Sequence, residues 1–143
     1  MSIDLQIING DLVISQGALS TVQDSQKLIQ DILKILLTDV GADPLQPNYG
    51  SFLSRSVIGN AMASGAIVQI AKAQINTCLV NLQQLQQLQI KSMQKVSADE
   101  QLAAITGISV IRSTSDPRLF NIKVSAITKG YQPVSTAFTV STI

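Results

Sequence analysis

The hydrophobic pattern of this sequence changes from helical spacing to strand spacing at about Gly107, and that change constrains the fold more than any other feature. Before that point, in residues 28–36 and 67–85, apolar residues recur every three or four positions, as in Leu28, Ile32 and Leu36. Near the C-terminus they alternate with other residues, as in Phe120 and Ile122. A period near 3.6 is typical of amphipathic helices, and a period of two is typical of half-buried strands. The sequence therefore predicts an α+β fold that ends in an antiparallel sheet.

The N-terminal segment predicts a small β-hairpin. Residues 3–15 alternate loosely around Asn9 and Gly10, and an Asn-Gly pair between two apolar runs is a strong signal for a tight turn. Residues 1–5 contain no basic leader followed by an apolar block, so we expect no secretory signal.

A first helix is expected to begin within residues 20–24 and to run to about Thr38. Two overlapping capping boxes are present there: one pairs Thr21 with Asp24, and the other pairs Ser20 with Gln23. Gly41 is placed to end the helix. One face should be buried, because an apolar stripe at helical spacing follows. The stripe consists of Leu28, Ile29, Ile32, Leu33 and Leu36.

A long central helix is expected from Ala61 onward. If it runs for roughly 30 residues it is about 45 Å long. A short helical turn is expected before it, within residues 51–57. The glutamine-rich run at residues 81–89 lasts little more than one heptad, which favours a solvated helix end over a coiled coil. The stripe of the long helix consists of Ile67, Ala71, Ile75, Cys78, Leu82 and Leu85.

The remaining residues predict one more short helix and then strands. Residues 97–100 form another capping box, and residues 102–105 supply the apolar positions of a short helix behind it. Residues 108–112 and 119–127 are expected to pair as antiparallel strands across a turn at residues 113–117. Lys129 and Gly130 make the next turn, and the β-prone segment 134–143 is expected to form a final strand. We expect one domain over residues 1–143.

The composition argues against several classes of function. Only 13% of the 143 residues are charged, the formal net charge is +1, and aromatic residues make up 3%. A nucleic-acid surface needs basic patches or stacking aromatics, so neither DNA nor RNA is an expected partner. Charged residues interrupt the apolar runs, so no membrane-spanning helix is expected. Cys78 is the only cysteine and is expected to be buried and apolar in character.

The residues that usually carry catalysis are scarce. The chain has no histidine, which removes the commonest general base and metal ligand. Glu100 is the only glutamate and is expected to cap a helix, so paired carboxylates would have to come from aspartates such as Asp39 and Asp43. Both lie in one loop without the opposed geometry of an acid and a nucleophile. We expect no enzyme, no metal and no cofactor.

The loop from Thr38 to Leu53 is the most telling motif, because it is a turn-forming segment attached directly to the end of an apolar helix. It can be an ordinary connection between helices or a docking element. Taken in order with the elements around it, the chain resembles the baseplate wedge and sheath-initiator family of contractile-tailed phages, also called lysozyme-like. The resemblance includes the step from Ser97–Glu100 into residues 108–112. Its loop motif consists of Thr38, Gly41, Pro47, Tyr49, Gly50 and Ser51.

This resemblance implies a structural role in the phage tail. It implies a C-terminal sheet like that of a sheath subunit, assembly in the host cytoplasm, and six copies in the virion, one per wedge. The partners it implies are the baseplate wedge proteins and the tail sheath protein, with tail tube or hub proteins as further candidates. Members of the family usually carry a Glu-Arg pair after the glycine, whereas this chain has Ala42 and Asp43. Docking to the wedge is therefore expected to use Gly41, Asp43, Pro44, Leu45, Pro47, Tyr49 and Gly50.

The same resemblance implies that the final strand meets the sheath by β-strand addition. An extended segment that joins an exposed sheet edge gains main-chain hydrogen bonds, and few charges block residues 134–140. The alternative is an internal edge strand of the domain's own sheet, and both can hold if one edge stays free. A cell-wall lytic enzyme of the tail and a general adaptor outside phages are the competing functions. The residues expected to face the sheath are Val134, Thr136, Phe138 and Val140.

Overall fold

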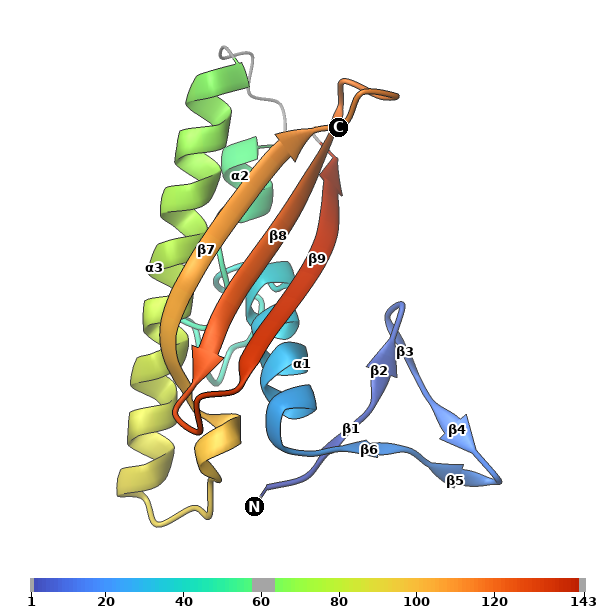
Figure 1. Cartoon of the computed structure of the whole chain (residues 1–143), viewed down its shortest axis with the longest axis vertical. Coiled ribbons are helices and arrows are strands. Elements are labelled where there is room, and N and C mark those ends of the chain that lie inside the picture. The colour runs from blue at the N-terminus through green and yellow to red at the C-terminus, as the bar shows by residue number, and fades with distance from the viewer. Residues whose placement is uncertain (1, 58–63, 142–143) are drawn as a thin grey trace.

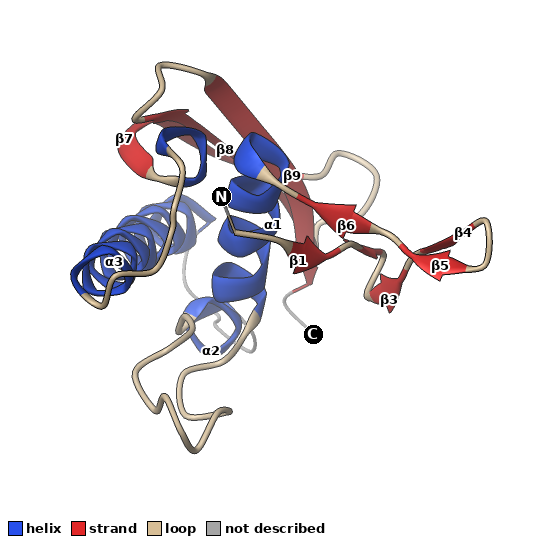
Figure 2. Ribbon diagram, turned by 90° about the horizontal axis from the view of Figure 1, so that it is seen from below, coloured by secondary structure: helices blue, strands red, loops and turns tan. Residues whose placement is uncertain are grey.

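A computed structural model describes residues 2–57 and 64–141 of the chain. Its main body has two layers, a three-stranded antiparallel sheet and a layer of helices against one face of that sheet (Figures 1 and 2). A separate β-arm projects from the lower end of the first helix (Figure 1). The predicted α+β class, with N-terminal strands, then helices, then an antiparallel sheet, is confirmed.

The arm comprises six two-residue strands and is larger than the predicted hairpin. The Asn9-Gly10 turn is confirmed, because it joins β2 to β3. A second tight turn at Gln16 and Gly17 joins β4 to β5, and β1 pairs with β6 at the base. The strands are β1 (Asp4–Leu5), β2 (Ile7–Ile8), β3 (Asp11–Leu12), β4 (Ile14–Ser15), β5 (Ala18–Leu19) and β6 (Thr21–Val22).

The first helix, α1, spans Asp24–Leu37, which agrees with the predicted start within residues 20–24 and the predicted end near Thr38, but the predicted capping is wrong. Neither capping box forms: Gln23 occupies the N-cap without a side-chain hydrogen bond, and Thr21 is drawn into β6 opposite Leu5. The Asp24 carboxylate instead accepts a hydrogen bond from Ser97 Oγ at 2.8 Å. The apolar stripe is confirmed in Leu28, Ile32 and Leu36, each of which is at most 2% exposed.

The helices α2 (Leu53–Val57) and α3 (Ser64–Lys91) match the predicted short turn and long helix. The expected start of the long helix at residue 61 lies outside the described residues. Its predicted stripe is buried from Ile67 to Leu82, and Leu85 is partly buried against the same core. Residues 87–90 are exposed as expected for the run at residues 81–89, but Leu82 and Gln86 are each only 5% exposed, so continuous exposure begins at residue 87.

A short 3-10 helix, η1 (Ala98–Glu100), replaces the helix that was predicted over residues 102–105. The capping-box residues are in place, since the Ser97 N–H donates to Glu100 Oε2 at 3.2 Å. The helix cannot continue, because Leu102 and Ile105 already pair with Thr128 and Ala126 as part of a strand. Residues 102–105 therefore begin the sheet.

The sheet has the order β7-β8-β9, with both pairs antiparallel. Alternating side chains of the central strand point toward the helices and are buried, which confirms the predicted alternation from Phe120 to Ala126. On the same side of the sheet, α3 packs against β7 and α1 packs against β9. The last two residues of the predicted final strand lie outside the described residues. The strands are β7 (Leu102–Arg112), β8 (Leu119–Thr128) and β9 (Pro133–Ser141).

Candidate docking surfaces

The loop after α1 is closed at its neck by backbone contacts. The Ser51 N–H donates to the Thr38 carbonyl at 2.8 Å, and the Val40 N–H donates back to the Ser51 carbonyl at 3.2 Å. Ser51 Oγ donates to the buried Leu36 carbonyl at 2.6 Å. Because the two ends of the loop are tied together this way, residues 39–50 form a compact loop on a rigid base.

Gly50 is required at the neck of this loop. Its φ is +120°, and a β-carbon there would stand 2.6 Å from the Thr38 carbonyl oxygen. Gly41 also has a positive φ, +88°, but a β-carbon there would meet nothing within 4 Å. Gly41 does not end α1 as predicted: the Thr38 N–H already bonds the Lys34 carbonyl at 3.1 Å, and Gly41 lies in the next turn.

The predicted docking residues separate into an exposed loop tip and a part of the loop that is buried against the core. At the tip, the Leu45 N–H donates to Asp43 Oδ1 at 2.9 Å, an Asx-turn that leaves Leu45 91% exposed. Pro44 and Pro47 are also exposed. Tyr49 is half-buried against the hydrophobic core, and this burial raises the pKa of its phenol. Gly50 is buried, so the tip holds the side chains that a partner can reach.

A groove of about 570 Å³ lies between this loop and α3. Tyr49 and Phe52 line it from the loop, and Leu85 and Leu88 line it from the helix. Cys78 also lines it, and its Sγ donates to the Gly50 carbonyl at 3.4 Å. Burial raises the pKa of this thiol to about 12, so it stays protonated at neutral pH and contributes packing rather than nucleophilic chemistry.

Strand β9 is an edge of the sheet. It pairs with β8 without interruption from Leu119 opposite Ser141 to Ile127 opposite Pro133. The predicted sheath-facing side chains point toward the helices: Val134 is buried, and Phe138 and Val140 pack against the core. The outward side chains are those between them, namely Ser135, Ala137 and Thr139.

The opposite edge, β7, is less regular. Its register against β8 shifts twice, between Leu102 and Ala104 and again between Ile105 and Gly107. Such irregularities bend a strand and hinder the addition of another one. The regularly paired edge strand β9 is therefore the better template for a further strand.

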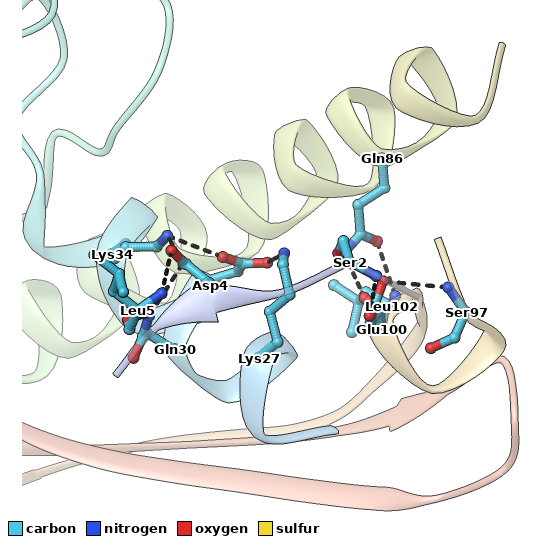
Figure 3. A network of polar contacts seen from close by, with 11 residues as sticks. Ser2, Asp4, Leu5, Lys27, Gln30, Lys34, Gln86, Ser97, Glu100 and Leu102 are labelled. Carbon is cyan, nitrogen blue, oxygen red and sulfur yellow. Dashed lines mark hydrogen bonds and ion pairs between the residues drawn. The ribbon is translucent and has the colours of Figure 1, made fainter. Parts of the chain in front are cut away.

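A polar network fixes the N-terminal strand to the body (Figure 3). Lys34 of α1 pairs with Asp4, and the Gln30 side chain both accepts from the Ile7 N–H at 2.9 Å and donates to the Leu5 carbonyl at 2.8 Å. Burial alone would lower the pKa of Lys34, but the hydrogen bond to Asp4 and the charge of Asp31 outweigh it and raise that pKa.

A second centre of this network is Glu100, which is 1% exposed. Its carboxylate accepts hydrogen bonds from the Ser2 N–H at 2.9 Å and from Ser2 Oγ at 2.8 Å. The Gln86 side chain ties the same turn to α3: it donates to the Glu100 carbonyl at 2.9 Å and accepts from the Leu102 N–H at 2.8 Å. No local sequence pattern indicates the contacts of Glu100 with Ser2 or of Gln86 with this turn.

Within the described residues, no group of three or more potential ligands among aspartate, glutamate and cysteine side chains is placed to hold a metal ion. No helix in that part of the chain combines the length and apolar character needed to cross a membrane.

Comparison with known proteins identifies the fold but no family. No protein-family model matches the chain, and no curated protein matches its sequence. A crystal structure from Geobacter sulfurreducens, of a protein with the provisional name tail lysozyme, superposes with a TM-score of 0.62. The match covers 92% of this chain and 96% of that one at 9% sequence identity. The chain therefore shares the fold of that protein along almost its whole length.

Proposed function

We propose that this chain is a structural component of a contractile phage tail baseplate, which attaches to the wedge and nucleates the tail sheath by β-strand addition. The observation that carries the proposal is the edge strand β9. Its register against β8 has no shift, it contains no charged residue from Pro133 to Ser141, and its inward side chains anchor it to the core. An uncharged, unbroken edge offers main-chain donors and acceptors to an incoming strand.

The shared fold supports a setting in a phage tail. The Geobacter protein carries the word tail in its name, and the likeness includes both layers and nearly every residue of each chain. In this proposal two separate surfaces make the two contacts: the loop tip around Leu45 binds the wedge, and β9 binds the sheath.

The sheath contact is tested by adding charge to the edge. Ser135→Lys combined with Thr139→Lys places two lysines on the outward side of β9 without touching the core. We expect tails assembled with this variant to carry baseplates without sheath in electron micrographs. Asn121→Lys is the control, because Asn121 is equally outward-facing but lies on the central strand. Normal sheaths on the double variant would refute the proposed contact.

The wedge contact is tested at the loop tip. Leu45 is 91% exposed, so Leu45→Lys should leave the fold unchanged while removing an apolar contact with the wedge. Met93, which is 92% exposed in the turn after α3, provides the matched control Met93→Lys. We expect only the Leu45 variant to fail to copurify with wedge proteins. Equal retention of both variants would remove the loop tip from the proposal.

A cell-wall lytic enzyme is the second candidate, and the name of the Geobacter protein favours it. The only glutamate, Glu100, is buried and bonded to Ser2 and Ser97, which supports a structural use of this carboxylate. A cell-wall digestion assay with the purified chain decides between the two. Digestion that disappears in Asp43→Asn would replace the structural proposal with the enzymatic one.

A further inference from the structure

The β-arm is built from a seven-residue repeat. Gly10 and Gly17 are seven residues apart, and their φ angles are +83° and +81°. The residues before them, Asn9 and Gln16, have φ angles of +53° and +50°, so the two turns have the same backbone form. The repeat continues in the leucines at positions 5, 12 and 19.

Three strand pairs meet at one junction, which gives the arm a triangular outline (Figure 1). The Gln6 N–H donates to the Ser20 carbonyl at 2.8 Å, the Ser20 N–H to the Val13 carbonyl at 2.8 Å, and the Val13 N–H to the Gln6 carbonyl at 3.1 Å. These donors and acceptors form a closed ring of three residues spaced seven apart. Residues at equivalent positions of the repeat are thus related by an approximate threefold axis.

One face of this triangle is apolar. Side chains of directly opposed residues in an antiparallel pair lie on the same face. The pairs nearest the junction are Ile7 with Leu12, Ile14 with Leu19, and Leu5 with Thr21. Because the threefold axis relates the three pairs, all of them lie on one face, which we call the apolar face. Its aliphatic side chains are between 39% and 69% exposed: Leu5 39%, Ile7 41%, Leu12 47%, Leu19 50% and Ile14 69%.

The opposite face carries the acids of the arm. The outer pairs are Asp4 with Val22, Ile8 with Asp11, and Ser15 with Ala18. Residues 2–23 contain no lysine or arginine, and both of their acids, Asp4 and Asp11, belong to these outer pairs. The apolar face therefore bears no charge, and a second such face can approach it without repulsion between like charges.

The apolar face is also complementary to itself. Each of these three pairs presents one leucine and one β-branched residue, isoleucine or threonine, side by side. A twofold axis that lies between two stacked triangles and runs along one pair reverses the order of the two residues, so in all three pairs each leucine lies over a β-branched residue of the other copy. An interface of this kind closes on itself, because both copies use the same patch.

We propose that the apolar face is a self-association surface, on which the arm of one copy stacks face to face on the arm of a second copy. The arm projects away from the helices and the sheet in both views, so a second arm can reach this face (Figures 1 and 2). Five aliphatic side chains per copy make a contact at the small end of protein interfaces, so the pairing is reversible and depends on concentration. The proposal is independent of a role in phage tails.

The test is sedimentation velocity of the full chain between about 10 and about 500 µM, a range suited to a small interface. We expect the sedimentation coefficient to rise from that of a monomer toward that of a dimer, and to do so equally in high salt, because the face is uncharged. Ile14→Lys should abolish the rise. Ser15→Lys, on the next residue but the opposite face, should leave it intact.

Folding is checked separately, by circular dichroism and the thermal midpoint, which should be the same for both variants because Ile14 and Ser15 are exposed. A wild-type chain that stays monomeric at every concentration would overturn the proposal and assign the face to a different protein. A dimer that persists in Ile14→Lys, or that is lost equally in Ser15→Lys, would also overturn it.

Discussion

Gly50 and Thr38 approach so closely that a β-carbon on residue 50 would stand 2.6 Å from the Thr38 carbonyl oxygen. The same carbonyl accepts the Ser51 N–H that closes the loop, so neither chain segment can move aside without breaking that bond. The exposed tip of the loop is thus held by one glycine at its base.

We therefore expect Gly50→Ala to destabilise the protein strongly. The positive φ and the backbone clash act together, and strained backbone positions alone cost about 1–3 kcal/mol. Urea denaturation of the purified variant measures the change in the free energy of unfolding. Gly41→Ala is the control, because it has a positive φ but open space around it, and it should cost about 1 kcal/mol. Equal losses in the two variants would show that the close approach to Thr38 does not matter.

Gln86→Leu should also destabilise the fold, although leucine fits a helix well. The substitution leaves the Glu100 carbonyl and the Leu102 N–H buried without their side-chain partner, and each unsatisfied group costs about 1–3 kcal/mol. The matched control is Gln87→Leu, on the next, exposed residue, which should change stability by less than about 0.5 kcal/mol. Thermal unfolding of the two variants side by side provides the measurement. A tolerated Gln86→Leu would mean that water replaces the lost bonds.

Elements with a local sequence pattern were predicted correctly, whereas contacts between residues that are distant in the sequence were missed. The stripe of α1 and the alternation of β8 follow directly from residue spacing, so both were found. The capping boxes before α1 failed because pairing with β1, at the start of the chain, took Thr21 into a strand. Residues 102–105 were assigned to a helix because nothing local shows that Thr128 and Ala126 pair with them.

For the two candidate docking surfaces, the sequence predicted which segments form them but not which of their side chains are exposed. The loop motif correctly indicated a compact turn, but burial of Tyr49 depends on its packing against the core, which no local pattern encodes. Likewise, the alternation in β9 could not show which side chains face the helices. The Asn9-Gly10 pair indicated the first turn of the β-arm, and the seven-residue repeat of leucines and glycines in residues 5–19 was the local signal for the rest of it.

The attachment of the arm to α1 should depend on pH through Asp4 and Lys34. Burial raises the pKa of Asp4, but the hydrogen bond and charge of Lys34 outweigh it and lower that pKa below 3.8. This stabilisation is present above pH 3.8 and is lost as the pH falls through the lowered value. The raised pKa of Lys34 gives the opposite case: its stabilisation is present below pH 10.5 and is lost as the pH rises through the raised value.

Hydrogen exchange of the arm amides, followed by NMR over this pH range after correction for intrinsic rates, measures the effect. We expect the protection of the Ile7 amide to fall at both extremes in the wild type. Asp4→Asn should lower it at neutral pH and remove the additional loss in acid. Protection that is the same in Asp4→Asn and the wild type at neutral pH would contradict this role of the ion pair.

Cys78 should resist thiol reagents in the native protein. Its pKa of about 12 leaves almost no thiolate at pH 8, and the side chain is 2% exposed beneath the groove. Iodoacetamide at pH 8, followed by mass spectrometry, should modify the thiol only after denaturation. Gly50→Ala provides a sensitive comparison, because the Gly50 carbonyl accepts the thiol hydrogen bond. Modification of Cys78 should be faster in that variant, since loosening the loop neck uncovers the thiol. Rapid labelling of the native wild-type chain would show instead that the groove opens to Cys78 without unfolding.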